Sequence, residues 1–188
     1  MMRPPVTAAL AALVMVGALS ACTDRPSLLE PVPALAGPYR LDAGDELRIV
    51  VYEQPSLTNL YEVDQSGQIS VPLIGDVPAR GATTDELAQR IETRLATAYL
   101  RDPNVTIEVA NYRPFFVLGE VTSPGQYNYV PGITAETAIA VAGGFTERAN
   151  KRVVRVSRQA NGRLYDLHLT VTELIQPGDT IYVVESLF

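Results

Sequence analysis

The sequence predicts an α+β protein made of two small units, each of which combines a sheet with one helix. Residues 112–145 carry the clearest pattern, a strand pair followed by a capped helix. Residues 39–111 carry another, in which short alternating segments precede a helix and a last strand follows it. Such elements form a compact unit when the helix packs across one face of the sheet. Hydrophobic residues make up 47% of the chain and charged residues 19%, so a folded core is expected.

The first unit is predicted to begin with a turn at Gly44-Asp45 that leads into a strand. The strand alternates, and the residues that share its apolar face are Leu47, Ile49 and Val51. Residues 61–64 and 68–71 follow, separated by Gln65-Ser66-Gly67. Because Gly67 can adopt a positive φ, we expect these two segments to pair as a hairpin.

One helix is expected in the first unit, from Asp85 to about Leu100. Thr83 and Glu86 have the spacing of a capping box, in which each side chain bonds the other's backbone N–H. The apolar stripe of this helix consists of Leu87, Ile91 and Leu95. Asp102-Pro103-Asn104 ends the helix, and residues 105–109 are predicted to form the last strand.

Two hairpins are predicted in the second unit. Residues 115–121 alternate, Ser123-Pro124-Gly125 supplies a turn, and residues 126–130 can return as the partner strand. Residues 152–158 and 163–169 can pair in the same way around Ala160-Asn161-Gly162. A helix is expected between the hairpins.

That helix is predicted to cover residues 135–142. Thr134 can accept a hydrogen bond from a free backbone N–H of the first turn, and Gly143-Gly144 stops the helix. Gly132-x-Thr134 repeats the Gly81-x-Thr83 pattern of the first unit, and a longer motif also repeats. The two copies of that motif are Leu41-x-x-Gly44-Asp45-x-Leu47-x-Ile49 and Ile175-x-x-Gly178-Asp179-x-Ile181-x-Val183. Two related units would explain the repetition, and so would common turn and cap devices.

Residues 1–21 have the order of a secretory signal peptide. Arg3 gives a positive start, an apolar run of about 14 residues follows, and Leu19-Ser20-Ala21-Cys22 closes it. The run is shorter than the roughly 18–20 residues that cross a bilayer as a helix. Cys22 is the only cysteine, so no disulfide partner exists for it. Residues 22–38 contain four prolines and are expected to form an extended tether.

Charge and motif content argue against several classes of function. The net charge is −6 and Lys151 is the only lysine, which disfavours a nucleic-acid surface. His168 is the only histidine, and the sequence has no metal-ligand spacing, so we expect no metal and no cofactor. Asp45 and Asp179 could belong to a glycosidase-type carboxylate pair, but both follow a turn glycine, where Asp usually accepts backbone hydrogen bonds. We expect no enzymatic activity.

Motifs in both units resemble a known family. In the first unit they are Tyr39-x-Leu41-x-x-Gly44-Asp45, Asp64-x-x-Gly67-x-Ile69-x-x-Pro72-Leu73-Ile74-Gly75 and Asp102-Pro103-x-Val105. In the second unit they are Val117-Leu118-Gly119-Glu120-Val121-x-x-Pro124-Gly125, Ala142-Gly143-Gly144-Phe145 and Pro177-Gly178-Asp179. The ordered set resembles the polysaccharide biosynthesis/export domain (residues 39–111) followed by a soluble-ligand-binding β-grasp (SLBB) domain (residues 112–188) of bacterial outer-membrane polysaccharide exporters. The residues to which the resemblance gives a structural role are Gly44, Asp45, Gly67, Gly75, Gly119, Pro124, Gly125, Gly143, Gly144, Gly178 and Asp179.

The resemblance implies a lipid-anchored exporter at the periplasmic face of the outer membrane. The residues before Cys22 resemble a lipobox, in which the cysteine is lipidated and becomes the new N-terminus, and Thr23 favours the outer membrane. The family implies a homo-oligomeric ring that conducts capsule polysaccharide or exopolysaccharide, and an inner-membrane polysaccharide co-polymerase, often a tyrosine kinase, as partner. Since the sequence stops at Phe188 after the last strand, it resembles the short exporters, which rely on an outer-membrane pore partner.

Tyrosines at the first hairpin of the second unit are candidates for glycan contact. Tyr112, Tyr127 and Tyr129 cluster there, and a tyrosine ring can stack on a sugar while its hydroxyl hydrogen-bonds. The same residues are compatible with half-buried strand positions, which are usual for tyrosine, so they are named only as candidates. The competing function is a periplasmic glycan- or small-ligand-binding lipoprotein without a transport role, which would not need to assemble. A wall-modifying enzyme is a third, weaker alternative.

Overall fold

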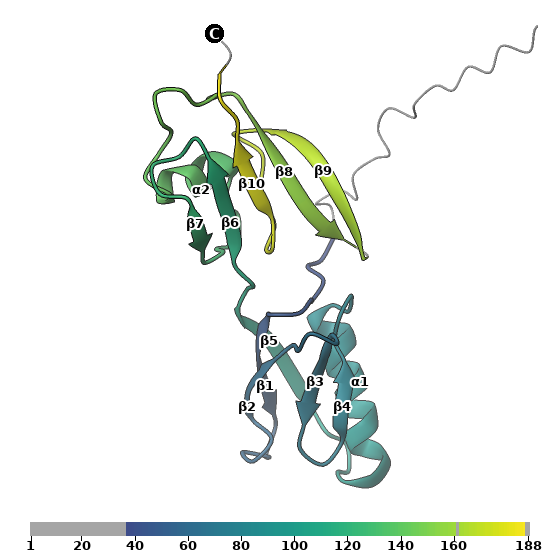
Figure 1. The fold of residues 1–188 in the computed structure, drawn as a ribbon. Helices are drawn as coiled ribbons and strands as arrows, with labels where there is room; N and C mark the ends of the chain where they lie inside the picture. The colour runs from purple at the N-terminus through teal and green to yellow at the C-terminus, as the bar shows by residue number, and fades with distance from the viewer. Residues whose placement is uncertain (1–36, 161, 187–188) are drawn as a thin grey trace, which may run out of the picture. The chain divides into compact units, whose positions relative to one another are not determined.

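The computed structural model describes residues 37–160 and 162–186, and the apolar residues among them form two hydrophobic cores. The first core is built from residues between Leu41 and Ile107, the second from residues between Phe115 and Val183. Strands predominate in both, with one helix each, so the α+β prediction is confirmed (Figure 1). The predicted signal peptide (residues 1–21), Cys22 and the predicted tether up to residue 36 lie outside the described residues.

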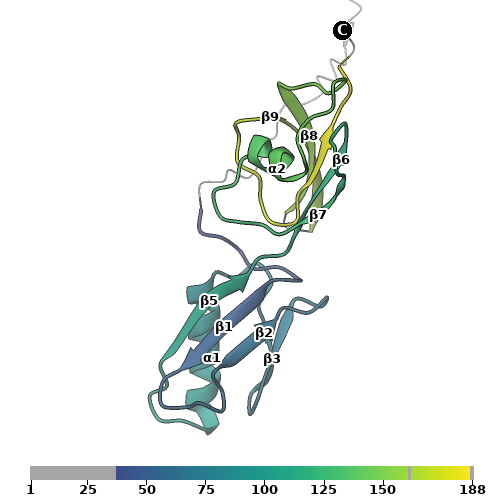
Figure 2. The same ribbon diagram turned by 90° about the vertical axis from the view of Figure 1, so that its left-hand side faces the viewer.

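The first unit contains a three-stranded antiparallel sheet in the order β2-β1-β5. Its strands are β1 (Glu46–Val51), β2 (Asn59–Glu62) and β5 (Val105–Asn111). Side chains of β1 alternate between buried and exposed, and those of Leu47, Ile49 and Val51 are buried as predicted. They pack with the apolar stripe of helix α1 (Thr84–Ala98), which runs along the sheet in Figure 2.

The N-terminus of α1 forms the predicted capping box. The Thr83 hydroxyl accepts from the Glu86 N–H at 3.1 Å, and the Glu86 carboxylate accepts from the Thr83 N–H at 3.2 Å. Two of the helix's otherwise unpaired N–H groups are thereby satisfied. Leu87, Ile91 and Leu95 are fully buried, which confirms the predicted stripe.

The hairpin predicted around Gln65-Ser66-Gly67 is wrong. β2 pairs with β1, whereas β3 (Gln68–Val71) pairs with β4 (Gly75–Pro78) in a separate two-stranded sheet. The turn itself exists, since the Asp64 N–H donates to Gln68 and the Gln68 N–H to the Asp64 side chain. The real hairpin turn contains Leu73 at a φ of +72°, a conformation that few residues other than glycine adopt. The residue type at position 73 does not indicate this conformation.

The second unit is a five-stranded sheet in the order β7-β6-β10-β8-β9. Its strands are β6 (Phe115–Gly119), β7 (Gly125–Tyr127), β8 (Val153–Ala160), β9 (Arg163–Thr170) and β10 (Thr180–Val183). The central pair β6 and β10 is parallel, and all other pairs are antiparallel. Helix α2 (Ala135–Val141) packs on one face of this sheet (Figure 2).

The two hairpins and the helix that were predicted in the second unit are all present. The first hairpin pairs Phe115 with Tyr127, and each of its strands ends earlier than expected, β6 at Gly119 and β7 at Tyr127. The second pairs β8 with β9 over eight residues each. Thr134 caps α2 by accepting from the Thr137 N–H at 3.2 Å. Within the described ranges, no helix has both the length and the apolar character needed to span a bilayer.

Candidate functional site

The repeated Gly-Asp motif forms the same turn in both units. Gly44 and Gly178 have φ values of +88° and +82°. In each copy a carboxylate oxygen of the aspartate accepts from the backbone N–H three residues earlier, at 2.9 Å for Asp45 and 2.7 Å for Asp179. Both aspartates are fully buried. The likeness ends there, because β1 after the first turn has only antiparallel neighbours and β10 after the second has one parallel neighbour.

Each buried aspartate is balanced by an arginine. Arg158 on β8 donates from Nε and Nη2 to the two oxygens of Asp179, at 2.9 and 2.6 Å. Arg113, which lies between β5 and β6, donates its backbone N–H to Asp45 at 3.0 Å and places its guanidinium 3.4 Å from the same carboxylate. A buried carboxylate without such donors would be strongly unfavourable. These turns are therefore charged, internally satisfied structural centres.

Tyr39 completes the centre around Asp45. Its hydroxyl donates to the Asp45 carboxylate at 2.7 Å and accepts from Arg113 Nη1 at 2.7 Å. Burial of the ring raises the pKa of Tyr39 well above its usual value, although the Arg113 charge acts in the opposite direction. Arg113 also crowds the second Gly-Asp turn, since a Cβ on Gly178 would lie 2.6 Å from Arg113 Nε. Arg113 thus touches both turns.

Two of the three candidate tyrosines are brought together, and the third packs separately. The Tyr112 ring makes edge-on contacts with Tyr39 and Tyr129, at centroid distances of 5.0 and 5.5 Å. Tyr127 instead stacks on Phe115 at 5.9 Å. The hydroxyls of Tyr127 and Tyr129 donate to the backbone carbonyls of Ser123 and Ile175. All three rings are partly exposed, so each combines a packing role with residual access to solvent.

The other motif residues lie at turns and strand ends. Gly67 precedes β3, Gly75 begins β4, Pro124-Gly125 leads into β7, and Gly143-Gly144 follows α2. Gly119 at the end of β6 is the most constrained of them. Its φ is +88°, and a Cβ there would lie 2.2 Å from the Val183 carbonyl oxygen, so β6 and β10 could not remain in register with any other residue.

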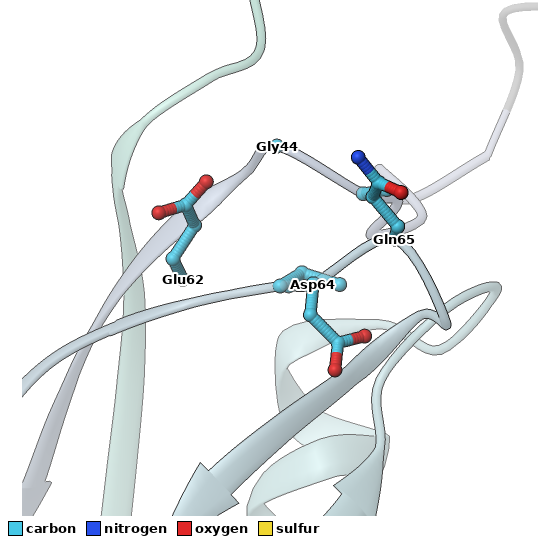
Figure 3. Close-up of a pocket in the computed structure, with 6 residues that line it drawn as sticks. Gly44, Glu62, Asp64 and Gln65 are labelled. Carbon is cyan, nitrogen blue, oxygen red and sulfur yellow. The ribbon is translucent and has the colours of Figure 1, made fainter.

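An open pocket of about 530 Å³ lies beside the first Gly-Asp turn (Figure 3). It is lined by Gly44, Glu62, Asp64 and Gln65, among others. Hydrogen bonds from the Ser66 hydroxyl and the Gln68 N–H lower the pKa of Asp64. Among residues 37–160 and 162–186, no group of three His, Cys, Asp or Glu side chains could hold a metal ion.

Sequence reasoning missed Arg113 and Arg158, and it gave Tyr39 a place in a motif but no role at the Asp45 centre. Arginine is common on protein surfaces, and its residue type alone does not distinguish Arg158, which is 4% exposed, from its exposed neighbour Arg155. The alternation of β8 does contain a signal, because Arg158 falls on the same face as Val154 and Val156. A charged residue in the apolar register of a strand requires a buried partner.

The fold and these turns define a two-unit α+β protein in which polar residues hold the turns together. Comparison with family models identifies the units. Residues 33–110 match the polysaccharide biosynthesis/export protein family, and residues 114–168 match the SLBB domain. The two matches occur in the expected order, and the chain belongs to the polysaccharide biosynthesis/export family.

Curated relatives have names that refer to polysaccharide production, export or transport. The chain is 37% identical over 142 residues to the exopolysaccharide production protein ExoF of Rhizobium meliloti (strain 1021), covering 69% of this chain and 34% of ExoF. It is 31% identical over 177 residues to the EPS I polysaccharide export outer membrane protein EpsA of Ralstonia solanacearum, covering 79% and 46%. It is 26% identical over 155 residues to the polysialic acid transport protein KpsD of Escherichia coli, covering 77% and 28%. The chain therefore spans less than half the length of these relatives.

Proposed function

We propose that this protein is a periplasmic component of a polysaccharide export channel and that it acts as a ring of identical copies. The observation that carries the proposal is the ordered pair of matches, an export domain followed by an SLBB domain. The names of the relatives support the same activity. We take residues 39–111 as the export domain and residues 112–188 as the β-grasp domain, and we assign neither a catalytic role.

A polymer conduit needs a hydrated path with weak, distributed contacts, since a tight site would stall the polymer. It also needs walls that keep their shape. The buried Asp45 and Asp179 centres support this role, because each one fixes the start of a strand at the middle of its sheet. Tyr112, Tyr127 and Tyr129 are partly exposed and remain candidates for contacts with the passing glycan.

We further propose that residues 1–21 are removed, that Cys22 is lipidated, and that residues 22–38 tether the protein to the periplasmic face of the outer membrane. The cysteine position and the proline-rich stretch after it support the anchor. A Cys22→Ser variant should then no longer be found in the membrane fraction. If it stays membrane-bound after high-salt washing, the anchor proposal is wrong.

The charge distribution supports a protein partner for the export domain. Residues 39–111 hold twelve acidic and six basic residues, whereas residues 112–188 hold seven of each, so the whole net charge of −6 belongs to the first unit. Such an excess of acidic residues favours a partner with basic residues. We propose an inner-membrane polysaccharide co-polymerase of the tyrosine-kinase type as that partner, and an outer-membrane pore protein as a second one.

The experiment that tests the function compares secreted polysaccharide from the parent strain and from one that lacks this protein. Export predicts loss of secreted polymer and its return on complementation. The ring is tested by the mass of the full chain in mild detergent. A monomeric mass together with unchanged secretion would favour the ligand-binding lipoprotein instead.

A further inference from the structure

The five-stranded sheet of the second unit presents a second face, opposite to α2. Strand alternation places the side chains of Val154, Val156 and Ile181 on the α2 side, in the core. Their sequence neighbours therefore point the other way. We call this surface the open face and define it by Phe116, Gln126, Arg155, Asp166, His168 and Tyr182, all partly or fully exposed.

Strand register orders these six residues into two rows. One row crosses the sheet from Gln126 through Phe116 and ends at Asp166, with Thr180 and Ser157 between them. In the other row, Tyr182 on β10 lies opposite Arg155 on β8, and Arg155 lies opposite His168 on β9. Phe116 and Tyr182 lie on adjacent strands in diagonal positions, for which the Cα atoms are roughly 8 Å apart. One extended ligand lying across the strands could touch both rings.

Arg155 differs from the arginine three residues later. Its guanidinium carbon lies 4.7 Å from the centroid of the Tyr182 ring, so the cation is held over an aromatic face. Arg158 points into the core, and two of its N–H groups bond Asp179. Among the described residues Arg155 forms no ion pair, and its N–H donors are left for a ligand.

Several polar groups around the two rings are also available to a ligand. Within the described residues, the side chains of Gln126, Asp166 and His168 make no hydrogen bond. The Tyr182 hydroxyl is likewise without a partner there. In contrast, Tyr127 and Tyr129 already donate their hydroxyls to backbone carbonyls. The open face therefore combines two accessible rings with several free donors and acceptors.

We propose that the open face binds a polysaccharide strand that carries carboxylate groups. The rings of Phe116 and Tyr182 stack on the apolar faces of sugar units, and Gln126 and Asp166 bond sugar hydroxyls. Arg155 supplies the charge complementarity, because a guanidinium held over a ring still has N–H donors for a carboxylate. This inference rests on the proposed export function and deepens it by naming the site and the chemical class of polymer.

A mixed surface of this kind suits a moving polymer better than a permanent partner. Obligate interfaces between copies have apolar cores, whereas here polar side chains flank both rings. Each contact is individually weak, as a conduit requires, and the contact between Arg155 and a carboxylate is also weakened by salt. A second copy of the chain on this face is the alternative occupant that the experiment must detect.

The test is affinity electrophoresis of the full chain in mild detergent, through gels that contain either polysialic acid, which is carboxylated, or dextran, which is neutral. Polysialic acid should retard the protein and dextran should retard it less, with the difference lost at high salt. Arg155→Gln and Tyr182→Ala should each weaken the retardation by polysialic acid about fivefold. The matched controls Arg101→Gln and Tyr52→Ala change an exposed arginine and an exposed tyrosine of the first unit and should have no effect.

Thermal unfolding shows whether each variant is folded. If Tyr182→Ala does not fold, Arg155→Gln still provides the test, because Arg155 is an exposed residue. Equal retardation of Arg155→Gln, Phe116→Ala and the controls would overturn the proposal. So would a lower oligomeric mass of these variants with unchanged retardation, because the face would then be an interface between copies. The two proposals fail separately. Normal binding by the variants with lost secretion in the deletion strain rejects only the open face, whereas open-face binding with unchanged secretion rejects the export function.

Discussion

Arg158 donates two hydrogen bonds to Asp179, with Nε 2.9 Å from Oδ1 and Nη2 2.6 Å from Oδ2, and both side chains are almost fully buried. Removing the carboxylate leaves a buried guanidinium without a counter-charge. Asp179→Ala should therefore lower the free energy of unfolding by about 3–5 kcal/mol, measured by urea denaturation.

The matched control for this pair is Glu185→Gln, which breaks the exposed ion pair between Arg148 and Glu185. Exposed pairs contribute little because water screens them, so the urea midpoint should hardly move. Equal effects of the two substitutions would contradict the structural importance of the buried pair.

Gly119 should tolerate no side chain. Gly119→Ala requires a Cβ 2.2 Å from the Val183 carbonyl oxygen, so β6 and β10 must separate and the unfolding free energy should fall by at least about 3 kcal/mol. Gly132→Ala isolates the backbone effect, since Gly132 has a similar φ of +83° and open space around it. That substitution should cost only about 1–2 kcal/mol. Similar losses for both, measured by thermal or urea unfolding, would argue against the close strand contact.

Stability at alkaline pH should depend on Tyr39. Burial raises the pKa of its hydroxyl, so the folded protein keeps the proton at a pH where the unfolded chain, with a pKa of about 10, releases it. The hydroxyl's contribution is complete below about pH 10 and is lost as the pH rises further. Tyr39→Phe should cost about 1–2 kcal/mol at pH 7, because Asp45 loses a donor.

The measurement is the urea midpoint of wild type and Tyr39→Phe between pH 8 and 11. The difference between the two proteins should stay constant up to about pH 10 and then shrink. Tyr52→Phe removes the hydroxyl of a tyrosine that is 70% exposed and should follow wild type throughout. If the difference in urea midpoint between wild type and Tyr39→Phe grew as the pH rose, the predicted direction of the pH dependence would be wrong.

Local signals were enough to predict most of the secondary structure. Thr83 and Glu86 form a cap through contacts that sequence spacing alone determines, and the alternation around Ile49 reports one buried face directly. The wrongly predicted hairpin shows that local signals predict a turn but do not determine which strands pair. The turn at Gly67 was correctly expected, but the pairing of β3 with β4 requires a turn in which Leu73 adopts a positive φ, and the residue type at that position does not indicate such a conformation.

The candidate site was harder to predict than the fold. Asp45 and Asp179 stood out because of the turn glycines before them. Their partners Arg113 and Arg158 lie 68 and 21 residues away in sequence, and only the folded sheets bring them close. The three tyrosines looked like one group in sequence, yet Tyr127 packs on Phe115 while the other two contact each other.

The candidate glycan contacts can be separated from packing roles by paired substitutions. Tyr127→Ala removes the ring that stacks on Phe115, and Tyr127→Phe retains it. If the Tyr127 side chain contacts the polymer, Tyr127→Ala should reduce polysaccharide secretion while the oligomer, measured by its mass in detergent, persists. A strain that carries Tyr127→Phe should secrete nearly normal amounts. Should Tyr127→Ala and Tyr129→Ala both leave assembly and secretion intact, these tyrosines do not contact the polymer.

The most direct test of the export function is the distribution of polysaccharide between cells and medium in a strain that lacks this protein and has no redundant copy. The same cells are measured after complementation with wild type and with Cys22→Ser. We predict that secreted polymer is lost in the deletion strain and restored by wild type, and that Cys22→Ser shows whether the anchor is required. Unchanged secretion in the deletion strain would contradict a role in export.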